Sequence, residues 1–276
     1  MKRRKPKSLV LSGNGINCEL ETAHANRLVG FDAEIVHINS LLDGTRSIHE
    51  YQFLNFPGGF LDGDDLGSAK AQAVKWKYQK VHATRATDAP FLDELVRFVA
   101  ERKIIIGICN GFQLLVKTGL LPALAGQYGD QSVTLTFNDS GRFQDRWVWL
   151  KVNQLSSCIF TKDMDRIYLP VRHGEGKLVT KTKETLQQLR DDGHIAMQYA
   201  DENGHVTTEF PWNPNGSADS IAALCDPSGR IFGLMPHPEA FVHYTQHPHW
   251  TREHLPEEGE GLKVFRNAYQ YVIDNL

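Results

Sequence analysis

A cysteine in a tight glycine turn is the residue of this sequence whose setting most favours covalent chemistry. Cys109 lies in the segment Gly107-Ile108-Cys109-Asn110-Gly111, directly after the apolar run 104–106 and directly before a helical pattern. Small residues two positions before and after a nucleophile let a strand and a helix approach closely, which holds the thiol at the carboxyl end of the strand. The partial positive charge at a helix start also favours a thiolate. An isolated turn of this kind is equally compatible with a buried structural cysteine.

A histidine and a glutamate two residues apart follow another apolar run. They lie in Gly233-Leu234-Met235-Pro236-His237-Pro238-Glu239, where a proline on each side of His237 restricts the backbone. Nucleophilic attack by a thiol needs an imidazole to move protons and a carboxylate to orient the ring. Such a pair alone is more typical of an ordinary protein surface, but together with the cysteine turn it predicts a Cys-His-Glu triad.

A third segment, Asn55-Phe56-Pro57-Gly58-Gly59, ends a short apolar strand that we expect beside the strand of Cys109. Two glycines leave backbone N–H groups unobstructed, and acyl transfer needs such donors for the developing oxyanion. The N–H of Asn110 would be the second donor. A plain turn explains Pro-Gly-Gly about as well.

The elements that must position these residues alternate between strand and helix in the first half of the chain. Strands separated by helices indicate a parallel sheet covered on both faces. In the second half, strand patterns separated by Asn, Asp, Gly and Pro indicate antiparallel pairing, so we expect a mixed sheet in one domain. The expected strands are 8–12, 33–38, 52–56, 103–107, 132–137, 146–152, 165–171, 195–199, 221–225 and 230–235, and the expected helices are 19–28, 90–101 and 261–275.

Composition excludes several classes of protein. The 276 residues are 41% hydrophobic, and 30 basic against 33 acidic residues leave a formal charge of −3, so we expect neither nucleic acid nor an anionic membrane as a partner. No apolar run is long enough for a transmembrane helix or a secretory signal, which predicts a cytoplasmic protein. Four scattered cysteines without a C-x-x-C pair indicate neither a disulfide scaffold nor a thiolate metal site.

Together the three segments resemble the class I glutamine amidotransferases, and within them the glutaminase subunits of phosphoribosylformylglycinamidine synthase from purine biosynthesis. Further segments narrow the resemblance to these subunits. They are Gly15-Ile16-Asn17-Cys18-Glu19, Gly63-Asp64, Gly119-Leu120-Leu121-Pro122, Gly141-Arg142-Phe143 with Arg146-Trp147-Val148, Pro170-Val171-Arg172-His173-Gly174-Glu175-Gly176, and Asn215-Gly216-Ser217. The resemblance implies an α/β fold with a flavodoxin-like, doubly wound mixed sheet in a single domain that spans residues 1–276.

The resemblance also implies a role for individual residues. Cys109 corresponds to the nucleophile, His237 to the general base and acid, and Glu239 to the carboxylate that orients it. Gly59 and Asn110 correspond to the amides of the oxyanion hole. The substrate-binding residues that it implies are Gly58, Gln113, His173, Gly174 and Glu175. The last two are equally compatible with an interface to a partner.

The implied activity is hydrolysis of L-glutamine to glutamate and ammonia. The ammonia would serve a synthetase subunit, assisted by a small accessory subunit, in the ATP-dependent conversion of formylglycinamide ribonucleotide to the amidine. The chain contains no P-loop sequence, so we expect no cofactor here and place ATP and magnesium in the partner. The alternatives are an amidotransferase of another pathway, a stand-alone cysteine γ-glutamyl hydrolase, and a catalytically silent binding subunit.

Three features remain outside this interpretation. Residues 62–90 form a basic insertion that includes Lys70, Lys75, Lys77, Lys80 and Arg85, for which a lid or docking role and a solvated helix are equal alternatives. The C-terminal extension and helix, 240–276, contains His243, His247, His249 and His254, whose irregular spacing does not favour a metal site. Cys18, Cys158 and Cys225 lack a glycine turn, and we expect them to be packing residues.

Overall fold

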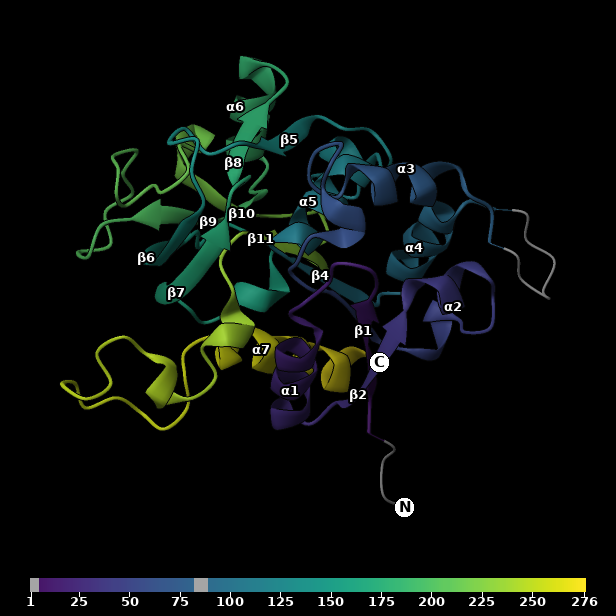
Figure 1. Ribbon diagram of the computed structural model, residues 1–276, viewed down its shortest axis with the longest axis horizontal. Coiled ribbons are helices and arrows are strands. Elements are labelled where there is room, and N and C mark those ends of the chain that lie inside the picture. Colours follow the sequence, from purple (N-terminus) through teal and green to yellow (C-terminus); the bar gives the residue numbers. More distant parts are fainter. Residues whose placement is uncertain (1–4, 82–88) are drawn as a thin grey trace.

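The computed structural model describes residues 5–81 and 89–276 of the chain. Part of the basic run 2–7 and Arg85 therefore lie outside the described residues. The helices are α1 (Glu19–Val29), α2 (Ile38–Leu42), α3 (Lys70–Tyr78), α4 (Phe91–Ala100), α5 (Asn110–Thr118), α6 (Lys183–Asp191) and α7 (Leu262–Asn275) (Figure 1). The strands are β1 (Lys7–Ser12), β2 (Asp32–His37), β3 (Phe53–Phe56), β4 (Ile104–Ile108), β5 (Val133–Thr136), β6 (Gln144–Val152), β7 (Arg166–His173), β8 (Lys177–Thr180), β9 (Ile195–Ala200), β10 (Ile221–Cys225) and β11 (Ile231–Leu234).

One nine-stranded sheet organises the fold, in the order β2-β1-β3-β4-β11-β10-β9-β6-β7. The strands from β2 to β11 pair in parallel, and those from β11 to β7 pair antiparallel. The expected mixed sheet is therefore confirmed. Its parallel half is built from apolar, β-branched strands such as β4, all of whose residues are buried because helices cover both faces.

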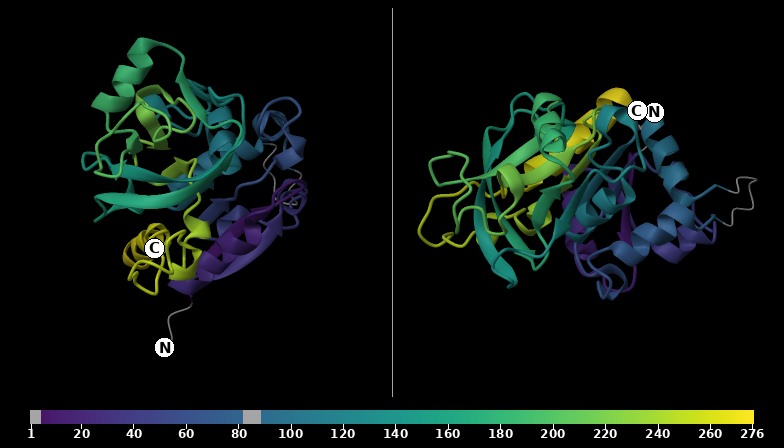
Figure 2. Two further views of the ribbon diagram at one scale, coloured as in Figure 1. Left: turned by 60° about the vertical axis from the view of Figure 1, so that its left-hand side comes forward. Right: turned by 90° about the horizontal axis from the view of Figure 1, so that it is seen from above.

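Helices pack on the two faces of the parallel strands (Figure 2). On one face α1 packs against β1, β2 and α7, while on the other α5 packs against β3, β4 and β11. Residue spacing explains α4, whose Phe91, Leu95 and Phe98 recur at helical intervals and are all buried. A single large hydrophobic cluster joins these layers to the antiparallel strands, which agrees with a single domain.

The predicted strand 132–137 exists but does not join the main sheet. It forms β5, which pairs antiparallel with β8 in a separate two-stranded sheet. Val133 and Leu135 are buried, and β5 packs on α5, so the alternating apolar face is satisfied by a helix and not by neighbouring strands. Neither β8 nor α6 was among the expected elements, because β8 has only 4 residues and α6 is mostly polar.

The basic insertion predicted at 62–90 is partly a core element. Its helix α3 packs against α4 and α5, and the Trp76 side chain is fully buried between the rings of Phe56 and Phe91 at centroid distances of 5.1 and 5.0 Å. The alternative of a merely solvated helix is therefore wrong for α3. The lid or docking role stays a prediction.

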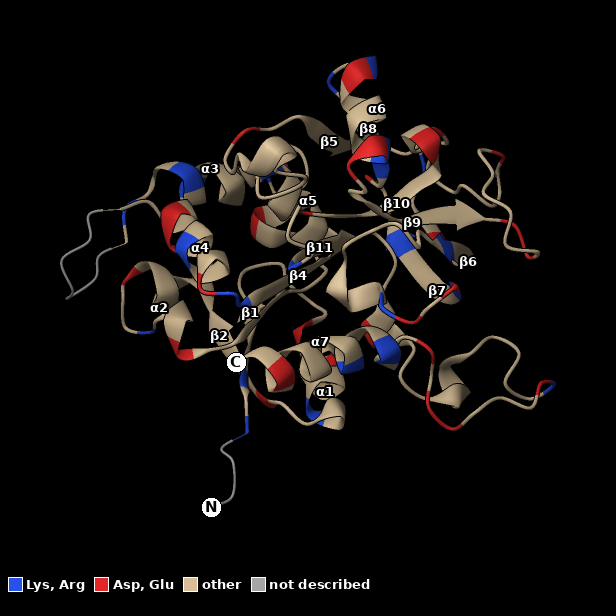
Figure 3. Ribbon diagram, turned by 180° about the vertical axis from the view of Figure 1, so that it is seen from behind, with Lys and Arg blue, Asp and Glu red and all other residues tan. Residues whose placement is uncertain are grey.

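Charged residues of both signs are interspersed along the helices and strands (Figure 3). On α3, Lys75 pairs with Asp62 at 2.9 Å, and Lys77 donates to the Gly129 carbonyl at 3.0 Å. Two of the lysines in the predicted basic insertion are therefore engaged within the chain. Among the helices of the described residues, none has the length and apolar character that a membrane crossing requires.

Three neighbouring parallel strands bring the distant sequence segments together. In the sheet β4 lies between β3 and β11, with Phe56 opposite Gly107 and Leu234 opposite Ile108. The turns that follow these strands consequently leave the sheet at one edge. The Gly58-Gly59 turn, Cys109 and His237 are placed next to one another by this register.

Candidate active site

Cys109 occupies the sharp turn between β4 and α5. Its backbone has a φ of 51° and a ψ of −105°, an unfavourable conformation for a residue with a side chain. The flanking glycine is required, because a Cβ on Gly111 would lie 1.8 Å from the Phe56 carbonyl oxygen. The turn thus holds the thiol at the sheet edge, with Sγ 3.6 Å from the carbonyl oxygen of Arg172.

His237 and Glu239 form a buried pair directly after β11. Nδ1 of the histidine lies 2.6 Å from Oε1 of the glutamate, and both side chains are almost inaccessible to solvent. Burial by itself would lower the pKa of His237, but the Glu239 carboxylate and the Cys109 side chain outweigh burial and hold that pKa well above its ordinary value. The pair therefore favours an imidazolium at neutral pH.

The other ring nitrogen of His237, Nε2, has no hydrogen-bond partner among the described residues. Gly58 lies against the ring and the thiols, since a Cβ there would be 2.8 Å from His237 Cε1, 3.3 Å from Cys18 Sγ and 3.5 Å from Cys109 Cβ. Any larger residue at Gly58 would push the imidazole away from the nucleophile. Gly58, expected to bind substrate, is not among the residues that line the cavity, and its close packing indicates steric support of the triad.

Two backbone N–H groups beside the thiol are available to a ligand. The N–H of Gly59 meets no acceptor in the described part of the chain. Gly59 forms a β-bridge with Ile16, but the hydrogen bonds of this bridge are donated by the N–H groups of Asn17 and Phe60. Asn110 is the first residue of α5, where the N–H has no intrahelical partner. Within the part of the chain that the structure describes, both N–H groups expected for an oxyanion hole therefore lack an acceptor.

A cavity of about 280 Å³ opens at this sheet edge. The predicted residues Cys109, His237, Gly59, Gln113, His173, Gly174 and Glu175 line it. Asn110 and Glu239 are buried behind its wall. The remaining residues around the cavity were not predicted as site residues: Asn17, Cys18, Phe60, Asp64, Phe137, Phe143 and Arg172.

Cys18, expected to be a packing residue, is buried and also lies on the wall of the cavity. Its thiol lines the cavity, and its sulfur, a nitrogen of His237 and an oxygen of Glu239 all lie within 4.8 Å of one another. Cys158 and Cys225 are buried in the core as expected. The segment that contains Cys18 was noticed in the sequence, but nothing in it indicates contact with a histidine more than two hundred residues away.

The residues expected to bind substrate are organised by a chain of amides. Asn110 Nδ2 donates to Gln113 Oε1 at 3.0 Å, and Gln113 Nε2 donates to the Glu175 carbonyl at 2.6 Å. The Glu175 carboxylate accepts from the N–H and hydroxyl of Ser68 at 3.2 and 2.9 Å. This network fixes the 173–176 segment against α5.

His173, expected to bind substrate, lies on the wall of the cavity. Its ring is buried, neither ring nitrogen has a partner among the described residues, and a Cβ on Gly176 would lie 2.5 Å from its Nδ1. Burial and, to a lesser extent, the neighbouring His237 lower the pKa of His173 to about 3. The imidazole of this lining residue is therefore neutral.

Two of the C-terminal histidines, His247 and His249, lie close together. His247 packs against the rings of Trp147, Tyr168 and Phe241, and the side chains of His247, His249 and Glu253 have possible ligand atoms within 4.8 Å of one another. The irregular spacing therefore did not predict how close these groups lie. His249 and Glu253 are about half exposed.

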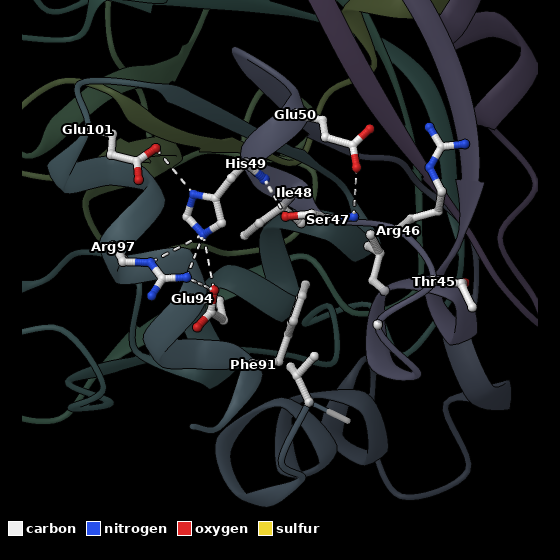
Figure 4. Close-up of a pocket in the computed structure, with 13 residues that line it drawn as sticks. Thr45, Arg46, Ser47, Ile48, His49, Glu50, Phe91, Glu94, Arg97 and Glu101 are labelled. Carbon is white, nitrogen blue, oxygen red and sulfur yellow. Dashed lines mark hydrogen bonds and ion pairs between the residues drawn. The ribbon is translucent and has the colours of Figure 1, made fainter. Parts of the chain in front are cut away.

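A larger cavity, of about 640 Å³, lies at the amino end of β3, away from the nucleophile (Figure 4). Several of its charged residues pair with one another: His49 lies 3.1 Å from Glu94 and 3.2 Å from Glu101, and Arg97 also bonds Glu94. Parallel strands direct their functional turns to the carboxyl edge, so the smaller cavity is the candidate active site.

Comparison with known proteins agrees with this geometry. Residues 5–272 match the family model of the CobB/CobQ-like glutamine amidotransferase domain. The chain is 46% identical to phosphoribosylformylglycinamidine synthase subunit PurQ of Dehalococcoides mccartyi, over 97% of this chain and 98% of that protein. It is 33% identical to phosphoribosylformylglycinamidine synthase of Drosophila melanogaster, over 96% of this chain and 19% of that protein.

The fold is also found in a solved structure, that of PurLQS from Thermotoga maritima. The superposition has a TM-score of 0.68 at 26% identity and covers 98% of this chain and 99% of that one. Sequence and fold agree over nearly the full length, and the chain belongs to the family of CobB/CobQ-like glutamine amidotransferase domains.

Proposed function

We propose that this chain is a glutaminase subunit that hydrolyses L-glutamine and supplies ammonia to phosphoribosylformylglycinamidine synthase. The observation that carries the proposal is the joint position of Cys109 and the buried His237–Glu239 pair on one cavity. Relatives named for this synthase, matched over almost the whole chain, support the choice of acceptor.

The first half of the reaction forms a thioester. The Cys109 thiolate attacks the carboxamide carbon of glutamine, and the N–H groups of Gly59 and Asn110 hold the oxyanion. The imidazolium of His237 gives a proton to the amide nitrogen, the carbon–nitrogen bond breaks, and ammonia leaves the γ-glutamyl thioester behind. The raised pKa of His237 suits it to this role as an acid.

The second half frees the enzyme. Neutral His237 takes a proton from water, the hydroxide attacks the thioester, and the carbon–sulfur bond breaks to give glutamate and the thiolate. Glu239 keeps Nδ1 protonated through the 2.6 Å hydrogen bond, so that Nε2 alone exchanges protons with the substrate.

The synthetase reaction belongs to a partner. Formylglycinamide ribonucleotide, ATP and magnesium would bind a synthetase subunit, and a small accessory subunit would complete the assembly. The name PurLQS of the solved relative supports an assembly of this kind. In the Drosophila synthase this chain corresponds to about a fifth of a longer protein, which supports direct coupling of the two activities.

The decisive experiment compares two nitrogen sources in the reconstituted synthase. With Cys109→Ala, glutamine-dependent synthesis of the amidine should disappear, while synthesis from added ammonium salt should keep its wild-type rate. Equal loss of both rates, or loss of neither, would contradict the proposal. Full glutamine turnover by the isolated chain, with no stimulation by the synthetase, would favour the stand-alone hydrolase instead.

A further inference from the structure

Asp64 is a carboxylate on the wall of the catalytic cavity that the triad chemistry does not use. It follows the Gly58-Gly59 turn and the short 3₁₀ turn Leu61–Gly63, and it lines the same cavity as Cys109. Its backbone has a φ of 56°, a conformation that residues with side chains seldom adopt. The chain therefore bends at a strained position to present this carboxylate.

The Asp64 side chain is fixed relative to the nucleophile. Oδ1 accepts from the Ala69 N–H at 3.0 Å, and Asn110 Nδ2 lies 3.3 Å from Oδ1 and 3.4 Å from Oδ2. Asn110 is the residue after Cys109, so one side-chain contact connects the carboxylate to the reacting centre. A carboxylate has about four acceptor positions, and among the described residues Oδ2 has one long contact, so acceptor capacity remains for a ligand.

The charges around Asp64 leave it short of a cation. Glu175 brings a second carboxylate to the same wall, whereas the nearby Lys117 ammonium donates to the carbonyl and hydroxyl of Ser68. Burial raises the pKa of Asp64 and the Glu175 carboxylate adds to this, and together they outweigh the hydrogen bonds from Ala69 and Asn110 and the charge of Lys117, which lower it. A cationic ligand group at Oδ2 would stabilise both carboxylates.

We propose that Asp64 binds the α-ammonium group of glutamine and makes the cavity selective for a free amino acid. This inference rests on the proposed function, which places the glutamine carboxamide at Cys109. Only four covalent bonds separate the carboxamide carbon from the ammonium nitrogen, and Asp64 and Cys109 line the same cavity of about 280 Å³, so a carboxamide held at Cys109 places the ammonium within this cavity. Peptides and carboxamides without this ammonium leave Asp64 unpaired and are rejected.

The test uses glutamine and glutaramate, which is glutamine without its amino group, as substrates of the reconstituted synthase. Asp64→Asn should raise KM for glutamine about 10- to 100-fold, the loss expected for a charged hydrogen bond, with little change in kcat. The weak kcat/KM for glutaramate should stay the same. The matched control is Asp65→Asn, which removes the same charge from an exposed neighbour and should alter neither substrate.

A purely structural role predicts a different result. If Asp64→Asn lowers kcat/KM for glutamine and glutaramate by the same factor, the proposal is overturned. A measurement on the wild type avoids any folding defect of the variant: glutamate should inhibit more strongly than glutarate, and equal inhibition would also overturn it. Absence of wild-type glutamine hydrolysis would instead contradict the proposed function.

Discussion

The imidazole of His237 and the carboxylate of Glu239 are joined by a 2.6 Å hydrogen bond between Nδ1 and Oε1, with both side chains buried. This contact determines which ring nitrogen faces the substrate. It also raises the pKa of the ring against the effect of burial, so the carboxylate sets both the orientation and the proton affinity of the proposed acid.

Removing the charge of Glu239 should therefore impair glutamine hydrolysis specifically. For Glu239→Gln we expect glutamine-dependent kcat/KM to fall about 10²- to 10⁴-fold, because ring orientation and proton transfer are both lost. The pKa of His237 should drop, which an NMR titration of the ring would detect. Ammonia-dependent synthesis by Glu239→Gln should keep its wild-type rate. The exposed control Glu202→Gln should leave the glutamine-dependent kcat/KM unchanged. An unchanged pKa of His237 would contradict this account of the pair.

Gly59→Ala tests the oxyanion hole. The φ of Gly59 is 142°, and a Cβ there would lie 2.6 Å from the Gly15 carbonyl oxygen, so the turn must shift and move its N–H group. Loss of one oxyanion donor should lower kcat about 10²- to 10³-fold. The control is Gly126→Ala, which also has positive φ but faces open space. It should reduce stability by about 1 kcal/mol and leave kcat unchanged. An equal effect of both substitutions on kcat would refute the assignment.

His173 should make the fold sensitive to acid. Its pKa is about 3 in the folded chain and near 6.5 when unfolded. At a pH between these two values the unfolded state therefore binds a proton that the folded state does not bind. Stability should accordingly decrease as pH falls from 6.5 toward 3, by up to about 1.4 kcal/mol per pH unit from this residue. The free energy of unfolding, measured in urea at several pH values, should depend less steeply on pH for His173→Asn than for the wild type. The exposed control His24→Asn should keep the wild-type pH dependence.

Trp76 tests whether α3 belongs to the core. The indole is fully buried between Phe56 and Phe91, so Trp76→Ala should lower the free energy of unfolding by about 3–5 kcal/mol. Val74→Ala, on the half-exposed side of the same helix, should change it by less than about 0.5 kcal/mol. Similar, small effects of the two substitutions in chemical denaturation would show that the segment is peripheral.

Much of the parallel half of the fold could be predicted from the sequence, because local patterns determine it. Apolar β-branched runs, an amphipathic helix and the Gly-x-Cys-x-Gly turn each carry their own structural preference, and the structure has β4, α4 and the Cys109 turn where these patterns lie. The pairing of β5 with β8 could not be predicted, because an alternating strand specifies a buried face and not its partner.

The candidate site, like the fold, could be predicted from the sequence only in part. The sequence by itself determined the residues able to do the chemistry, Cys109, His237 and Glu239, since nucleophile, acid and orienting carboxylate are recognisable from residue type and local turn. Only the tertiary structure decided that Cys18 and Asp64 line the same cavity as Cys109 and His237. Those side chains lie on turns whose positions depend on strand order and register, and long-range pairing of this kind leaves no trace in the local sequence.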